Sequence, residues 1–317
     1  MGRNFSKTWQ YLLDHEKELK GRERGKWKSR KDWYAFGRKQ NLHRFEQKKI
    51  LVQVLANRSS FTLDDSGIYY FTGGSTAGAY GILLNDEYNT AEDYLYFLGL
   101  LNSNVLEFYI KHISQLFSGG YYAYGRQYLE KLPLKLPQTS EEEDIACEII
   151  STVERIFKQH KELSELENKT SEFPDSYISE ELHPLLNVTE GQELSKESYS
   201  PSRLRIEVED IEGRKIYKVA LTKKDYIAFK TESSAKFLFE ILKKKDRIIK
   251  SDLLRMEVPS DADAERIMRK YEGDLKKMGD LKRERADLDK SIDEQVYELY
   301  ELDEEDRRVI EDGISGR

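Results

Sequence analysis

The hydrophobic positions in the first 90 residues predict one helix followed by short strands. Apolar residues recur at helical spacing over residues 5–19, which predicts a short amphipathic helix with Ser6 as its N-cap. The run at residues 49–55 is short and almost wholly apolar, as a buried strand is. Residues 60–63 and 68–71 flank a polar turn and predict a β-hairpin.

From about Thr90 the apolar period lengthens to that of a helix. One broad apolar face runs through residues 94–113, and two longer helices are predicted at residues 141–166 and 275–302. At about 1.5 Å per residue, each long helix would span roughly 40 Å. Their narrow apolar stripes and similar lengths favour antiparallel pairing. Between them, alternation over residues 203–230 predicts a small β module.

The segment 132–137, Leu-Pro-Leu-Lys-Leu-Pro, provides a domain boundary. Each proline removes a backbone donor and biases the preceding residue away from helix, so the segment is extended. The predicted fold class is therefore α+β. A mixed β-rich domain occupies residues 1–137, and a long helical pair follows at residues 138–317, with a small β module inserted at about residues 201–232.

The charge balance differs strongly along the chain. The 317 residues contain 52 Lys and Arg against 59 Asp and Glu, a net charge of −7 that disfavours nucleic acid as a partner. Residues 1–60, however, hold 16 basic and 6 acidic side chains, residues 61–137 hold 4 and 8, and residues 138–317 hold 32 and 45. Such asymmetry points to an anionic partner for the first segment alone.

Several classes of chemistry are absent from the sequence. The apolar runs are too short to span a membrane, and the polar N-terminus lacks a signal-peptide core, so we expect a cytoplasmic protein. Cys147 is the only cysteine and is expected to pack in a helix core, and the five histidines lack metal-ligand spacing. There is no Pro-Pro dipeptide, so an Asn-Pro-Pro-Tyr loop is missing, and no AdoMet-type glycine loop occurs. We therefore predict no catalytic centre, metal or cofactor in this chain.

Residues 27–58 interleave aromatic and basic side chains. Lys and Arg neutralise phosphates, and Arg, Asn and Gln can read base edges by paired hydrogen bonds. The alternative is a solvated basic surface with aromatics in the core, and composition alone does not decide between the two. The candidate DNA contacts are Trp33, Tyr34, Arg38, Lys39, Gln40, Asn41 and Arg58.

Residues 118–126 form a second candidate, rich in glycine and tyrosine. Glycines let a backbone approach a ligand closely, and tyrosines supply flat apolar area with a hydrogen-bonding tip. A tight connection packed by aromatics explains this segment alone slightly better. The candidate residues are Ser118, Gly119, Gly120, Tyr121, Tyr122 and Arg126.

Several strings, taken in order, resemble the TaqI-like C-terminal specificity domain. They are Trp-Tyr-Ala-Phe-Gly-Arg-Lys-Gln-Asn-Leu at 33–42, Lys-Ile-Leu-Val-Gln-Val-Leu at 49–55, Tyr-Tyr-Phe at 69–71, Tyr-Phe-Leu-Gly-Leu-Leu-Asn-Ser at 96–103, Gly-Gly-Tyr at 119–121 and Tyr-Leu-Glu-Lys-Leu-Pro-Leu at 128–134. Residues 292–300 are similar to the closing helix of such proteins. The resemblance spans essentially the whole chain and is firmest at residues 30–165.

The resemblance implies target recognition in adenine-specific DNA methyltransferases and single-chain restriction–modification enzymes. The first domain would sit on double-stranded DNA, and the long helices would act as a spacer or dock onto a catalytic chain that binds AdoMet. Because members usually carry a methyltransferase domain before this part, the chain is expected to be a stand-alone specificity subunit, part of a split enzyme or the product of a truncated gene. A non-DNA helical interaction protein, in which the acidic helices bind and the basic segment is incidental, is the remaining alternative.

Overall fold

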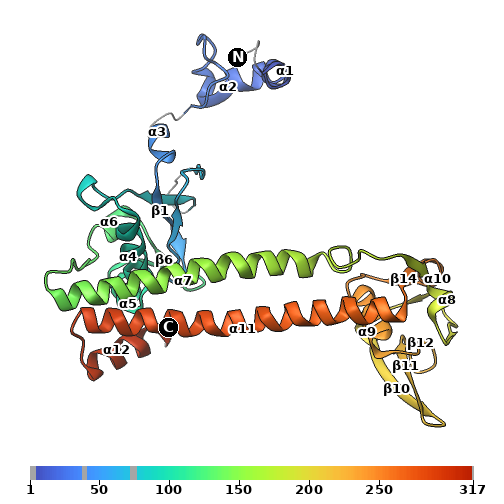
Figure 1. Ribbon diagram of the computed structural model, residues 1–317. Helices are drawn as coiled ribbons and strands as arrows, with labels where there is room; N and C mark the ends of the chain where they lie inside the picture. The colour runs from blue at the N-terminus through green and yellow to red at the C-terminus, as the bar shows by residue number, and fades with distance from the viewer. Residues whose placement is uncertain (1–4, 38–40, 72–76, 316–317) are drawn as a thin grey trace. The chain divides into compact units, whose positions relative to one another are not determined.

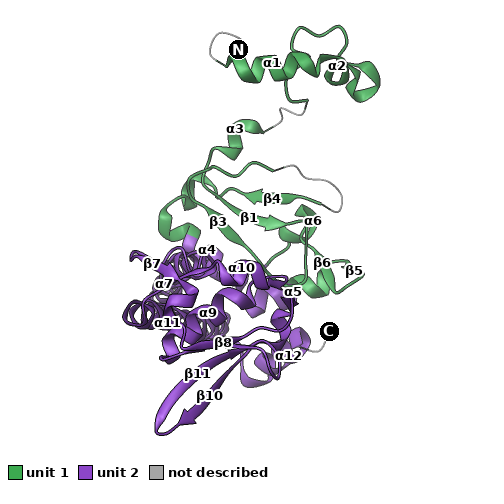
Figure 2. Ribbon diagram, turned by 90° about the vertical axis from the view of Figure 1, so that its right-hand side faces the viewer, with its two compact units in different colours: residues 1–94, 110–132 green, residues 95–109, 133–317 purple. Residues whose placement is uncertain are grey.

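A computed structural model describes residues 5–37, 41–71 and 77–315. The chain divides into two compact units, residues 1–94 with 110–132 and residues 95–109 with 133–317 (Figure 2). The fold is α+β as predicted, with small antiparallel sheets and a long helical pair. The division cuts helices α4 (Ala91–Asn102) and α5 (Asn104–Ile113), so the domain boundary at residue 137 stays a prediction.

The first unit begins with two helices, α1 (Ser6–Asp14) and α2 (Glu16–Gly25). The helix predicted at residues 5–19 is present but is divided at His15, whose φ of −104° and ψ of 15° interrupt it. Phe5, not Ser6, occupies the N-cap position, and no side chain caps the helix. The prediction of Ser6 as the cap is therefore wrong, because Ser6 already lies within the helix.

Two three-stranded sheets share one extended run of chain in this unit. The first has the order β3 (Thr62–Asp64), β1 (Lys49–Gln53), β4 (Ala79–Ile82), and the second has the order β2 (Leu55–Ala56), β6 (Tyr121–Ala123), β5 (Leu116–Phe117). Val54 joins them: its N–H donates to the carbonyl of Gly78 at 3.1 Å, and its carbonyl accepts from the N–H of Tyr124 at 2.9 Å. The predicted strand at 49–55 therefore serves both sheets.

The hairpin predicted from residues 60–63 and 68–71 does not form. β3 pairs with β1 instead, with Lys49 opposite Asp64, and residues 68–71 have no strand partner. The physical reason is that Asp64 accepts hydrogen bonds from the N–H groups of Ile68 and Tyr69, each at 3.1 Å, and a side chain thus replaces the strand ladder. The unit also contains α3 (Leu42–Phe45), a 3-10 turn η1 (Asp86–Tyr88) and α6 (Arg126–Leu129).

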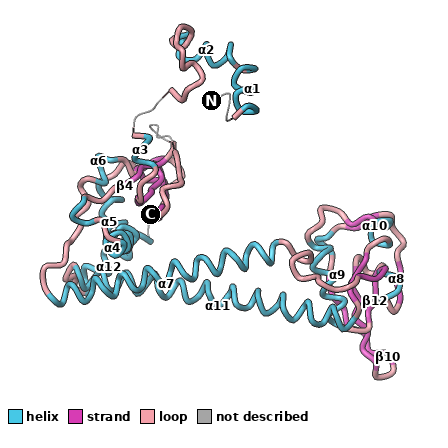
Figure 3. Tube along the Cα trace, turned by 45° about the horizontal axis from the view of Figure 1, so that its top comes forward, coloured by secondary structure: helices cyan, strands magenta, loops and turns pink. Residues whose placement is uncertain are grey.

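Two long helices, α7 (Ser140–Ser171) and α11 (Asp261–Leu299), lie side by side in the second unit (Figures 1 and 3). They are antiparallel, because Arg155 pairs with Glu284 and, further along α7, Lys169 pairs at 2.6 Å with Asp274, which comes earlier in α11. Both helices are confirmed and are longer than predicted. Cys147, expected in the core, is exposed on α7 while Ala146 and Ile149 face inward, so that expectation is wrong.

The β module between the helices is larger than predicted. Its elements are β7 (Leu182–Pro184), α8 (Leu185–Val188), β8 (Gly191–Glu193), β9 (Ser198–Tyr199), the 3-10 turn η2 (Pro201–Arg203), β10 (Arg205–Ile211), β11 (Arg214–Ala220), β12 (Tyr226–Phe229), α9 (Glu232–Lys243), β13 (Ile248–Ile249), α10 (Lys250–Leu254) and β14 (Glu257–Pro259). The predicted range 201–232 covers the β10–β12 meander only. Strands of two or three residues outside it are too short to show a period of two.

The module has its own apolar core and is fastened to the helical pair. Val219, Ile227 and Phe229 from the sheet are fully buried within it against α9. From the end of α9, Lys244 donates to the carbonyls of Ser171 at 3.1 Å and Phe173 at 3.0 Å, at the end of α7. A cation at a helix C-terminus satisfies carbonyls that lack helical partners.

At the other end of the helical pair, the C-terminal end of α11 contacts residues 133–135. The Tyr300 hydroxyl donates to the carbonyl of Pro133 at 2.6 Å, and the Lys135 ammonium donates to the carbonyl of Leu299, the last residue of α11. Lys135 also pairs with Glu142 at 2.8 Å. A final helix, α12 (Glu304–Ser315), completes this unit. Within residues 5–37, 41–71 and 77–315, no helix combines the length and the apolar character needed to cross a membrane.

Candidate nucleic-acid interface

An aromatic cluster orders the basic N-terminal helices. The ring of Trp33 lies 6.1 Å from that of Trp9 and 5.6 Å from that of Tyr34, and Trp33 is buried while Tyr34 is half-buried. Arg22 donates to the carbonyls of Trp33 at 2.7 Å and Ala35 at 3.1 Å. Trp33 thus packs in the core of the cluster, and DNA contact by Trp33 and Tyr34 stays a prediction.

Trp27 packs between two guanidinium groups of the same segment. Arg22 and Arg30 lie over its ring at 4.6 and 4.5 Å from the centroid. Arg30 also forms two hydrogen bonds with Asp32, both 2.9 Å, and these raise the pKa of the guanidinium further. Part of the basic charge therefore stabilises the cluster, while Lys28 and Lys31 remain exposed on the loop between Trp27 and Asp32.

The next candidates along the chain are residues 38–41. Arg38, Lys39 and Gln40 fall outside the described residues. Asn41 is exposed and has a φ of +61°, a conformation that asparagine tolerates better than most residues. Its carbonyl accepts from the N–H of Arg44 at 2.8 Å, so Asn41 starts the short helix and Arg44 is exposed on it.

The two sequence candidates Arg58 and 118–121 converge at one end of one sheet. β2 runs antiparallel to β6 with Ala56 opposite Tyr122, so the chain leaving β2 at Arg58 runs beside the chain entering β6. β5 pairs with β6 with Phe117 opposite Tyr121, which places the connecting turn at that same end. Residues about sixty positions apart are thereby brought together by strand register alone.

The turn at this end has the glycine geometry that its sequence suggests. Gly119 and Gly120 have φ values of +82° and +78°, which disfavour any residue with a Cβ, and Ser118 is exposed beside them. Tyr121 is exposed and Tyr122 is buried, because alternate strand residues face opposite sides of the sheet. The ammonium of Lys111 lies 5.7 Å from the centroid of the Tyr122 ring. Arg126 is exposed beyond the sheet and pairs with Glu130 at 3.4 Å.

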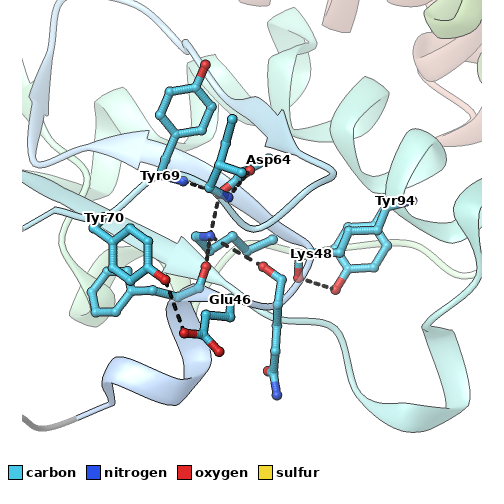
Figure 4. Close-up of polar contacts among 10 residues, drawn as sticks. Glu46, Lys48, Asp64, Tyr69, Tyr70 and Tyr94 are labelled. Atoms are coloured by element: carbon cyan, nitrogen blue, oxygen red, sulfur yellow. Dashed lines mark hydrogen bonds and ion pairs between the residues drawn. The ribbon is translucent and has the colours of Figure 1, made fainter. Parts of the chain in front are cut away.

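A buried ion pair supports a further loop that sequence reasoning missed. Lys49 donates to Asp64, and their side chains are only 2% and 1% exposed (Figure 4). Burial alone would raise the pKa of Asp64, but Lys49 and two backbone N–H groups outweigh it and hold that pKa below its usual value. The residues that follow, Ile68 to Tyr70, are exposed. The sequence signal for this loop was three apolar residues directly after a polar turn. The hairpin prediction assigned these residues to a strand instead.

These features show that the first unit presents exposed loops from two small β-sheets. Residues 3–134 match the family model of the TaqI-like C-terminal specificity domain. This match supports a specificity role in DNA methyltransferase systems. The match ends before α7, so the resemblance expected for residues 135–165 and 292–300 lies outside it. No curated protein matches the chain closely enough to serve as a relative.

Proposed function

We propose that this chain recognises specific sequences in duplex DNA as the specificity part of a restriction–modification or DNA adenine methylation system. The observation that carries this proposal is the family match at residues 3–134. It coincides with the part of the chain in which 16 basic side chains outnumber 6 acidic ones, over residues 1–60. A local excess of cations is what phosphate contact requires.

We assign the sheet end formed by Arg58 and the 118–121 turn to DNA contact. Arg58 is exposed and can reach a guanine edge or a phosphate, and glycines at 119 and 120 allow close backbone approach. Tyr121 adds flat apolar area beside them. Residues 38–41 and Arg126 are further proposed contacts. Sorting these residues into base readers and phosphate contacts requires affinities measured on several sequences.

The second unit is proposed to carry the partner chain. Residues 138–317 hold 45 acidic against 32 basic side chains, a balance that repels phosphate. Its helical pair and β module therefore suit a spacer or a dock for a catalytic chain in the cytoplasm, on which AdoMet would bind. Methyl transfer by a mixture of the two chains, and not by this chain alone, would identify it as part of a split adenine-specific methyltransferase.

Selection from random duplexes, with and without a candidate catalytic chain, tests the proposal. We expect enrichment of one sequence, with affinity that falls steeply as salt rises. Arg58→Ala should weaken binding by about 1–3 kcal/mol and relax specificity at one position if Arg58 reads a base. The matched control is Arg203→Ala, an exposed arginine of the second unit, which should bind as the unsubstituted chain does. Absence of duplex binding even at low salt would contradict the proposal and favour a non-DNA interaction protein.

A further inference from the structure

Three consecutive side chains of the first unit are unusually exposed for their type. Ile68, Tyr69 and Tyr70 have 65%, 59% and 57% of their surface open. The adjoining Asp64 and Gly67 are buried, so the exposure begins abruptly. Contiguous exposed apolar side chains of this kind are a feature of interaction surfaces.

The backbone under these side chains is held in place by two sets of contacts. Asp64, itself paired with buried Lys49, accepts from the N–H groups of Ile68 and Tyr69 at 3.1 Å each. Gly67 has a φ of +64°, and a Cβ there would lie 2.3 Å from the carbonyl oxygen of Glu46. The loop is therefore fixed by the fold rather than left exposed by poor packing.

The two tyrosines differ in how far their rings are engaged. The ring of Tyr70 stacks on Phe45 at 5.6 Å, and its hydroxyl donates to Glu46 at 3.2 Å (Figure 4). Tyr69 points away from the buried ion pair, and within the described part of the chain its ring has no aromatic or cationic partner (Figure 4). Tyr69 and Ile68 therefore offer open apolar faces, with Tyr70 as a fixed support.

The loop adjoins the predicted DNA-contacting segment. Phe45, which stacks on Tyr70, belongs to α3, and that helix follows the N-cap residue Asn41 and carries exposed Arg44. Near the loop itself cations are not in excess: Glu46 accepts from Tyr70, and Asp65 is neutralised by Lys48 at 2.9 Å. Carboxylates repel phosphates, so this surface suits the uncharged faces of bases rather than the DNA backbone.

We propose that Ile68 and Tyr69 form a base-contacting wedge that packs against an opened or unstacked base step of the bound duplex. Apolar and aromatic side chains inserted at base steps have this role in other DNA-binding proteins, and aromatic rings stack on bases whatever their sequence. The inference rests on the proposed function, because it needs bound DNA, and extends it to two residues that carry no charge.

The test uses the full chain and the duplex that the unsubstituted protein enriches. Tyr69→Ala should weaken binding roughly 5- to 150-fold, the range for loss of one stacked base, whereas Tyr69→Phe retains the ring and should bind nearly normally. The dependence of affinity on salt should be unchanged in both variants, because no phosphate contact is lost. Ile68→Ala should show a smaller loss, and Tyr109→Ala, a partly exposed tyrosine of the second unit, should show none.

A second readout reports the base step directly. With 2-aminopurine in place of each adenine of the enriched site in turn, we expect fluorescence to rise at one position with the unsubstituted chain and not with Tyr69→Ala. Failure of the unsubstituted chain to bind any duplex would defeat the proposed function and the wedge together. Normal DNA binding and fluorescence by Tyr69→Ala would overturn the wedge alone, and loss of catalytic-chain binding instead would assign the loop to a protein partner.

Discussion

The two units obtain their rigidity by different means. The second unit uses regular elements: helices of 32 and 39 residues and a β module with a continuous apolar core. The first unit has strands of two to five residues and holds loops with a buried ion pair, side chains that accept backbone donors, and arginines over tryptophan. Polar contacts hold particular loops of the first unit in place, whereas in the second unit apolar packing dominates and Lys244 and Lys135 add polar contacts at the ends of the helical pair.

The largest predicted effect comes from breaking the buried Lys49–Asp64 ion pair of the first unit. Lys49→Met leaves the Asp64 carboxylate buried without its cation and should destabilise this unit by about 3–5 kcal/mol. Hydrogen exchange should accelerate in peptides covering residues 47–71 and stay unchanged in residues 210–240. A cost below about 1 kcal/mol would mean that water or a neighbouring donor replaces the ammonium.

The double substitution Lys49→Met with Asp64→Leu sharpens the same comparison. Removing both charges together should recover most of the stability, because a well-packed apolar pair substitutes for a buried ion pair. The N–H groups of Ile68 and Tyr69 would still lack their acceptor. We therefore expect restored global stability with persistently fast exchange at residues 67–71, a separation that a purely global role for the pair would not produce.

In the second unit the position most sensitive to substitution is a close contact between α4 and α7. A Cβ at Gly99 of α4 would lie 2.5 Å from a methyl carbon of Ile149 and 3.2 Å from one of Val153, both on α7. Gly99→Ala should therefore destabilise this unit by about 1–3 kcal/mol through overpacking, measured by denaturant unfolding. In an Ile149→Ala background, which lacks the contacting methyl carbon, Gly99→Ala should cost less than in the unsubstituted chain, and an unchanged cost would indicate a backbone cause.

The second unit also contains a carboxyl whose ionisation opposes folding. Asp293 of α11 accepts from the N–H of Asn104 at 2.7 Å, and burial raises its pKa to about 7. The protonated carboxyl contributes its full stabilisation below about pH 4, which is the ordinary pKa of an aspartate. This stabilisation is lost as pH rises through about 7. Asp293→Asn, which keeps the acceptor, should stabilise the protein by roughly 1–2 kcal/mol at about pH 8 and hardly at about pH 4. Thermal unfolding across this pH range measures the effect, and equal effects at both ends would exclude ionisation as the cause.

The smallest effect is expected on the solvent side of α11. Gly273 lies inside this helix with open space where an added methyl group would lie, so Gly273→Ala should stabilise the second unit by about 0.5–1 kcal/mol. The comparison with Gly99→Ala is informative, because the same substitution should have opposite signs at the two positions. Matching signs in denaturant unfolding would argue that packing at Gly99 relaxes easily.

The elements that the sequence predicted correctly are those that a local pattern of residues determines. The apolar run at 49–55 and the stripes of α7 and α11 are periodic over enough residues to be read directly. The hairpin at 60–71 was wrong because a side chain, Asp64, accepts the donors that a strand would have used. Strands β7, β9, β13 and β14 carry too few residues for any period to show.

The candidate interface was harder to predict from the sequence than the fold. Residue types suggested Arg58 and the glycine turn separately, but their convergence depends on the register of Ala56 opposite Tyr122, a pairing distant in sequence. The burial of Trp33 and Tyr122 and the exposure of Tyr69 also depend on which face each residue presents. Composition alone does not contain that information.

The contact between Lys135 and Leu299 has a consequence for synthesis on the ribosome. Its partners are 164 residues apart, so at about 5–20 residues per second the lysine waits roughly 8–33 s for its acceptor to be made. During that interval α7 lacks α11, so the face of α7 that packs on α11 is uncovered. The first unit comprises residues 1–94 and 110–132, all of which are made before this interval begins. Nascent chains should therefore acquire protease resistance in the first unit well before the second, and chaperones should engage the waiting helix.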